Sequence, residues 1–279
     1  MNSDTIRPRL QLSVGSLALL GEELPSLGGR RVFAANCREM GAPWQVTLHP
    51  IPPEGPEPSA IRDRVARLQV LTHRGLKVPI AAGDLDGRAW VIEPQLTSPS
   101  ALLRLSDGGA LSVRQGIRAL RDVTRAIATL HRAGLAHGGL DLATIHLDDD
   151  GAQVTGFGAV ASADARADLD ALGPIAWAFF TGDLPDGRPQ RLGERRRGIP
   201  EGLDAIVASL LAADVGQRPV RAEVVLNALD AFPTPVPSPI ASFLEGAGRG
   251  TRSPRARETM ILMLLFGLTV LVSTLIFKR

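Results

Sequence analysis

The fold is best recognised from residues 130–158, LHRAGLAHGGLDLATIHLDDDGAQVTGFG, where helical spacing of apolar residues gives way to β-favouring runs. This stretch begins in the last turns of an amphipathic segment, 112–133, whose apolar residues recur at helical spacing, with Ser112 as the expected N-cap and Gly134 beyond the end. A loop follows, and two short β-favouring runs then flank an acidic turn. The stretch therefore predicts a helix, a loop and a β-hairpin, in that order.

The patterns on either side of this stretch differ from each other. Toward the N-terminus, β-favouring runs dominate; toward the C-terminus, apolar residues recur at helical spacing. The expected strands are 32–37, 44–51 and two within 77–94, and the expected helices are 60–71, 112–133, 168–180, 201–213 and 219–231. A strand-rich part followed by a larger helical part predicts an α+β fold with two lobes.

Composition limits the classes of partner. The formal net charge is +2, which is too small to indicate a nucleic-acid partner. The only cysteine, Cys37, excludes an internal disulfide and is typical of a reducing cytoplasm. Lys77 and Lys278 are the only lysines, and this preference for arginine suggests a bacterial origin. The five histidines show no metal-ligand spacing, so no metal site is expected.

The C-terminus predicts a membrane anchor. Residues 260–277 carry no charge, and as a helix they span about 27 Å, close to the bilayer's hydrocarbon thickness of about 30 Å. A linker rich in Pro, Gly and Arg precedes them at 232–258. A transmembrane helix at 259–277 predicts a tail-anchored, single-pass protein of the cytoplasmic (inner) membrane, with the lipid bilayer as a partner and the main domain in the cytoplasm.

Residues 25–231 resemble the eukaryotic-type (Ser/Thr) protein kinases, which also occur in bacteria. The likeness is strongest at 130–158, which is similar to the family's catalytic loop, the hairpin after it and the start of the activation segment. Other similar landmarks follow in order: RAWVIEP at 88–94, DLDALG at 168–173, TGDLP at 181–185 and QRP at 217–219. The resemblance implies a two-lobed protein-kinase-like fold, with a tail at 1–15, a β-rich N-lobe at 16–94 and a helical C-lobe at 95–231, followed by the transmembrane helix.

The positions that carry phosphoryl transfer in that family are substituted in this chain. His49 stands where the family has its strand lysine, and Gly139 stands where it has the catalytic-loop aspartate. The two positions that hold Mg²⁺ are Thr144 and Gly156. The resemblance therefore implies a pseudokinase without enzymatic activity.

Two further parts of the family pattern are reduced. Gly28 and Gly29 are present, but the G-x-G-x-x-G spacing of the phosphate-covering loop is not. The activation segment is truncated, because too few residues remain between Gly158 and Asp168 to hold it. Arg218, whose family counterpart pairs with a glutamate of that segment, therefore needs another partner or lies in solvent.

The structural positions of the family remain. Leu68, His137 and Phe157 match positions at which the family stacks side chains between its lobes, and Asp168 matches the aspartate beneath them. We therefore expect His137 to be a packed, hydrogen-bonded residue and not a base.

Three functions remain open on these residues. The first is a scaffold or allosteric module without a cofactor that binds protein partners at the cytoplasmic membrane face. The second is a sensor that binds ATP or ADP without Mg²⁺; its expected contacts are Gly28, Gly29, Val32, Thr47, Glu93 and Leu147. The third is a divergent kinase in which Asp141 replaces the base; the alternative role for Asp141 is to cap its own loop.

A basic loop is the remaining candidate for binding. RPQRLGERRRG at 188–198 contains five arginines, including Arg195, Arg196 and Arg197. It is interpreted either as a surface for anionic lipid or an acidic partner, or as an ordinary solvated loop.

Overall fold

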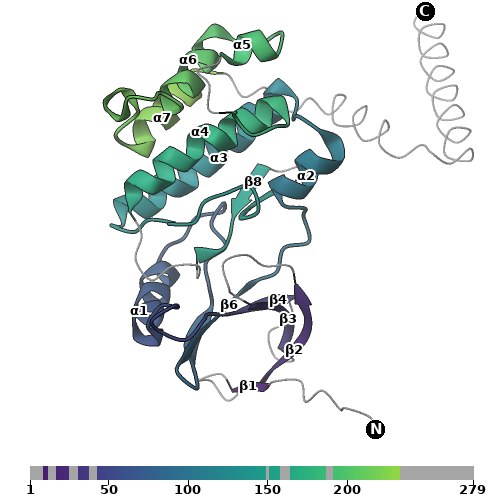
Figure 1. Cartoon of the computed structure of the whole chain (residues 1–279), viewed down its shortest axis with the longest axis vertical. Helices are drawn as coiled ribbons and strands as arrows, with labels where there is room; N and C mark the ends of the chain where they lie inside the picture. Colours follow the sequence, from purple (N-terminus) through teal and green to yellow (C-terminus); the bar gives the residue numbers. More distant parts are fainter. Residues whose placement is uncertain are drawn as a thin grey trace, which may run out of the picture. The chain divides into compact units, whose positions relative to one another are not determined.

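The structure, a computed structural model, describes residues 9–11, 17–24, 31–37, 43–148, 151–157, 164–186 and 191–232. The chain divides into two units, Met1–Pro233 and Thr234–Arg279, and every described residue belongs to the first. Figure 1 shows the strands of this first unit in purple and blue and its later helices in teal and green. Gly28 and Gly29 lie outside the described residues.

The first part of the chain forms a six-stranded antiparallel sheet and one helix. The strand order is β1-β2-β3-β4-β6-β5. The elements are β1 (Arg9–Gln11), β2 (Leu17–Leu24), β3 (Arg31–Cys37), β4 (Trp44–Leu48), α1 (Pro58–Gln69), β5 (Ala81–Leu85) and β6 (Arg88–Pro94). Asp86 and Gly87 join β5 to β6 with φ of 54° and 79°, the positive values that a tight hairpin turn requires.

The two faces of this sheet have different partners. Residues paired across antiparallel strands point to the same face. One face presents an apolar cluster made of Phe33, Ala35, Val46, Leu48, Trp90 and Ile92. On the other face, Ile61 and Val65 of α1 pack on Ala89 and Val91. Since Ala89 and Val91 belong to β6, α1 covers the β5–β6 side of that face.

The second part of the chain is mainly helical and contains a two-stranded sheet. Its elements are α2 (Ala101–Gly108), α3 (Val113–Arg132), β7 (Ile145–Asp148), β8 (Gly151–Val154), α4 (Ala165–Thr181), α5 (Leu192–Arg195), α6 (Glu201–Leu210), the 3₁₀ turn η2 (Val215–Gln217) and α7 (Ala222–Asp230). In Figure 1, α3 and α4 run side by side, and α6 and α7 pack across them. One large core joins these helices to the β7–β8 hairpin and includes Leu68 and Leu76 from the first part of the chain.

Close packing fixes α3 between its neighbours. Gly116 lies against the ring of Phe180, because a Cβ atom at Gly116 would come within 2.4 Å of that ring. The buried guanidinium of Arg121 donates hydrogen bonds to the carbonyl oxygens of Leu229 (2.6 Å) and of Phe232 (2.7 Å), the last described residue. The carbonyl of Leu229 also accepts a backbone N–H from Phe232, so Arg121 adds a second donor there and connects the end of α7 to α3.

No α-helix within the described ranges is long and apolar enough to cross a membrane. The longest, α3, has 20 residues but carries arginines along its length; α4, apolar over most of its length, has only 17 residues, fewer than the about 20 that a span needs. The fold class with a C-terminal transmembrane helix is therefore wrong, as are the transmembrane and tail-anchored descriptions and the single-pass inner-membrane localisation. The segment 259–277 on which these predictions rested lies outside the described residues. Residues the structure does describe form a mixed fold of seven α-helices and two antiparallel sheets.

Candidate functional site

The buried carboxylate of Asp168 holds the loop between α3 and β7. Asp168 is only 1% exposed and lies in the first turn of α4. One oxygen accepts hydrogen bonds from the backbone N–H of His137 (2.7 Å) and from Nε2 of His131 (2.9 Å). The other accepts the N–H of Gly138 (2.8 Å). Burial alone raises the pKa of Asp168, but these hydrogen bonds outweigh it, so the pKa lies below its ordinary value. The carboxylate therefore remains charged and fixes the loop.

Both ring nitrogens of His137 are engaged in hydrogen bonds. Nε2 lies 2.7 Å from the carbonyl oxygen of Thr155, to which only a protonated nitrogen can bond, and Nδ1 accepts the N–H of Gly139 at 3.2 Å. The ring also packs against Phe157, with centroids 4.8 Å apart. This arrangement requires the neutral ring, and burial lowers the pKa of His137 accordingly. His137 is therefore a packed residue, as expected, and has no nitrogen available to act as a base.

The neutral form of His137 makes the stability of the fold sensitive to acid. In the unfolded chain histidine takes up a proton near pH 6.5, whereas the folded chain resists protonation until a lower pH. We expect the free energy of unfolding to fall as the pH drops below about 6.5, with His137 contributing up to about 1.4 kcal/mol per pH unit. Urea unfolding of the full chain between pH 7.5 and pH 5.5 measures this slope.

The matched variant for that measurement is His137→Gln, which keeps a donor for the Thr155 carbonyl but does not titrate. Its unfolding free energy is expected to be lower than wild type at neutral pH and to depend less steeply on pH. His73, whose pKa burial also lowers, keeps its own share of the slope in both proteins. Equal slopes in the two proteins would contradict a neutral, buried His137.

Thr144 and Gly156, the two positions expected to be substituted metal ligands, lie against each other. Gly156 has φ of +82°, in the region that favours glycine. A Cβ atom placed on Gly156 would come within 2.8 Å of Cγ2 of Thr144. A side chain at Gly156 would therefore have to displace the methyl group of Thr144 and adopt a strained backbone conformation. Within the described residues no group of three or more His, Cys, Asp or Glu side chains is placed to hold a metal ion.

The carboxylate of Asp141 organises its own loop. Its Oδ1 accepts the N–H groups of Ala143 (2.9 Å) and Thr144 (2.8 Å). In return, the hydroxyl of Thr144 accepts the N–H of Asp141 and donates to its carbonyl oxygen, both at 3.0 Å. This is the capping role weighed for Asp141 from the sequence.

Arg64 of α1 is the main functional-site residue that the sequence reasoning missed. Its guanidinium is buried and donates to the carbonyl oxygens of Ala136 (2.6 Å), His137 (3.0 Å) and Phe157 (3.1 Å). Burial lowers the pKa of Arg64, while the charge of Asp168 opposes that change. The signal in the sequence is an arginine on the apolar face of its helix, between Ile61 and Leu68. Arg64 thereby connects the sheet-and-helix part of the chain to both loops around His137.

Three of the residues expected to contact a nucleotide share one face of the large sheet. Val32 and Thr47 are register partners on β3 and β4, and Glu93 pairs with Gln45, two residues along the same face. Thr47 and Glu93 are buried, and Gln45 donates to the Glu93 carboxylate at 3.4 Å. Leu147 lies on β7 in the other sheet. Beyond the end of β4, His49 is buried and its backbone N–H bonds to Ala89.

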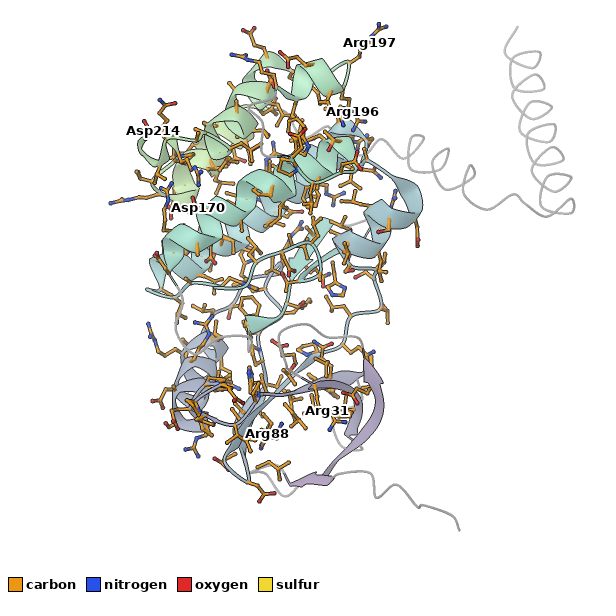
Figure 2. All side chains as sticks on the ribbon, in the orientation of Figure 1. Arg31, Arg88, Asp170, Arg196, Arg197 and Asp214 are labelled. Carbon is orange, nitrogen blue, oxygen red and sulfur yellow. The ribbon has the colours of Figure 1, made fainter. Side chains whose placement is uncertain are left out.

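Arg218 has a partner in the structure. Its guanidinium donates to Asp170 of α4 at 2.9 Å and to the carbonyl oxygen of Ala212 at 2.6 Å. Arg166, one turn before Asp170, lies 3.2 Å from the same carboxylate. Figure 2 labels Asp170 on α4, beside the loop that contains Asp214. Arg218 is therefore paired with a carboxylate and does not lie free in solvent.

The described arginines of the basic loop do not act as one surface. Arg196 donates to the carbonyl oxygens of Leu111 and Phe180 and fixes the loop on the end of α4. Arg191 lies 3.4 Å from the carboxylate of Asp204. Arg197 is exposed and extends away from the ribbon in Figure 2. The loop's arginines therefore divide between internal contacts and solvent, and Arg188 lies outside the described residues.

Comparison with known proteins does not place the chain in a family. The chain matches none of the known protein-family models, and a search of curated proteins finds no match to it.

Proposed function

We propose that this chain is a degenerate relative of the eukaryotic-type protein kinases that binds a protein partner and transfers no phosphate. The observation that carries the proposal is that Gly156 has no side chain and that the hydroxyl of Thr144 is bonded to the backbone of Asp141. Phosphoryl transfer needs divalent cations to neutralise the phosphates, and these are the two positions at which the kinase family holds them. The loop around His137 is instead held by hydrogen bonds to the Asp168 carboxylate and to the ring of His137.

The contacts of the loop support the same proposal. A catalytic base must have a free proton acceptor within reach of the substrate. Gly139 has no side chain, both nitrogens of His137 are bonded, and Oδ1 of Asp141 holds the amides of its own loop. Buried polar groups satisfied within the fold stabilise one conformation, which suits a surface that a partner recognises. The role proposed is therefore scaffolding or allosteric control by contact.

A second candidate function is nucleotide binding without transfer. It is favoured by the shared sheet face of Val32, Thr47 and Glu93, next to the part of that face that α1 covers. Thr47 supplies a hydroxyl on that face. The substitution of His49 for the strand lysine weighs against tight binding of phosphates.

A thermal unfolding titration of the full chain with ATP and with ADP, each with and without Mg²⁺, separates the two functions. A ligand that binds only the folded state at 100 times its Kd stabilises that state by about 2.7 kcal/mol, which raises the Tm by several degrees. We expect no saturable rise at millimolar nucleotide, and no transfer of labelled phosphate from ATP to the chain. A saturable rise that does not need Mg²⁺ would favour the nucleotide sensor, and a Mg²⁺-dependent rise with phosphate transfer would overturn both.

A further inference from the structure

Two consecutive peptide groups in the loop between α3 and β7 are hydrogen-bonded on both of their sides. The first joins Ala136 to His137, and the second joins His137 to Gly138. The carbonyl oxygens of both groups accept Nη2 of Arg64, at 2.6 Å and 3.0 Å. Their N–H groups donate to the two carboxylate oxygens of Asp168, at 2.7 Å and 2.8 Å. We call these two groups the bridging peptides.

The two side chains that hold the bridging peptides carry opposite charges and come from different helices. Arg64 belongs to α1 and is 6% exposed, and Asp168 belongs to α4 and is 1% exposed. No hydrogen bond or ion pair joins these two described residues directly, and the side chain bonded to Asp168 is that of His131. Burial lowers the pKa of Arg64, but the charge of Asp168 opposes that change. The cation and the anion therefore act on each other across the bridging peptides.

A peptide group that lies between a cation and an anion has both of its hydrogen bonds strengthened. The guanidinium draws electron density toward the carbonyl oxygen, which makes the N–H of the same group a better donor to the carboxylate, and the carboxylate has the reverse effect. Removal of either charge is therefore expected to weaken the bonds that the bridging peptides make to the other charge.

We propose that the bridging peptides couple α1 to α4, so that a displacement of either helix weakens the hold on the other. The first turn of α4 contains Asp168, and the rest of the helix packs against α3 and α6, so the coupling connects α1 to the helical part of the chain. This is a route for the allosteric control proposed above, and in that role it rests on the proposed function.

A double-mutant cycle on the full chain, followed by urea unfolding, tests the coupling. Arg64→Leu and Asp168→Asn are measured singly and together. We expect the unfolding equilibrium constant of the double variant to be about tenfold smaller than the product of the two single changes predicts, because the second set of bonds is already weakened once the first charge is gone. If the Arg64→Leu protein does not fold, Arg64→Lys takes its place in the same cycle.

The matched control cycle pairs Asp168→Asn with Arg67→Leu. Arg67 lies on the same helix and donates to the carbonyl of Gly134 in the same loop, but it makes no bond to a bridging peptide. Its changes are expected to multiply within about twofold. A second readout is hydrogen exchange: Asp168→Asn should speed exchange in α1 relative to α7, and Asp170→Asn should not.

Three results would overturn the proposal. The first is an Arg64–Asp168 cycle in which the single changes multiply, and the second is an equal deviation in the control cycle. The third is an α1 whose exchange relative to α7 is unchanged in Asp168→Asn. Each would assign the connection between the helices to apolar packing, such as that of Leu68 in the large core. These measurements need no partner or nucleotide, so their failure is distinguishable from a failure of the proposed function.

Discussion

Replacing Asp168 by asparagine is expected to lower the free energy of unfolding by about 3 kcal/mol, which corresponds to a fall in Tm of roughly 10 °C for a domain of this size. The asparagine side chain has the same shape but only one acceptor oxygen. Its NH₂ group then faces one of the backbone donors, His137 or Gly138, that the carboxylate now satisfies. Urea unfolding monitored by circular dichroism measures the loss.

The control for this change is Asp170→Asn, two residues further along α4. Asp170 pairs with Arg166 and Arg218, but its side chain is 37% exposed, so we expect a loss below about 1 kcal/mol. The two variants also differ in acid. The low pKa of Asp168 means that its charge stabilises the fold above about pH 4 and that this contribution is lost as the pH falls further. Asp168→Asn is therefore expected to flatten the acid limb of the stability curve, and a stability equal to wild type would refute the assignment.

Periodicity in the sequence predicted the elements whose side chains alternate between core and solvent. The helix expected at 112–133 is α3, and Ser112 caps it through a reciprocal pair of hydrogen bonds with Gln115. The helix expected at 60–71 is α1, displaced by two residues. β1, which falls in the expected tail at 1–15, β2, α2 and the four-residue α5 were not predicted. The short α2 has only Ala101 and Leu105 buried, too few apolar positions to establish a helical period.

At the candidate site, the sequence predicted the residues whose place in the chain matches a known packing position, but not the residues that meet only through tertiary contacts. His137 and Phe157 were expected to pack together, and their rings are in contact. The partner of Arg218 was left open, because Asp170 lies 48 residues away in sequence and only the packing of α4 brings it near. The internal bonds of Arg196 were not foreseen either, since a run of arginines in a loop is typical of a solvated surface. Tertiary contacts of this kind have no local pattern.

The role of Arg64 leads to the second large effect that we expect. Arg64→Leu keeps an apolar stem on the buried face of α1 but removes every donor to the carbonyl groups of Ala136, His137 and Phe157. Leaving buried acceptors unsatisfied costs about 1–3 kcal/mol each, so a total of about 3 kcal/mol is expected after partial relaxation. Hydrogen exchange followed by mass spectrometry should show faster exchange throughout α1 and in the loop at 134–144, because this arginine connects them.

The matched control is Arg67→Leu, one turn further along α1. Arg67 is exposed and donates to a single carbonyl, that of Gly134, so its loss is expected to change unfolding by less than about 1 kcal/mol and to leave the exchange of α1 unaltered. Arg64→Lys retains one cationic donor and is expected to lie between the two. If α1 exchanged equally in the Arg64→Leu and Arg67→Leu proteins, the connection between α1 and the loop would have to come from apolar packing of Ile61, Val65 and Leu68 alone. The expected order is therefore Arg64→Leu, then Arg64→Lys, then Arg67→Leu, and it follows from the number of buried carbonyl groups that each variant leaves without a donor.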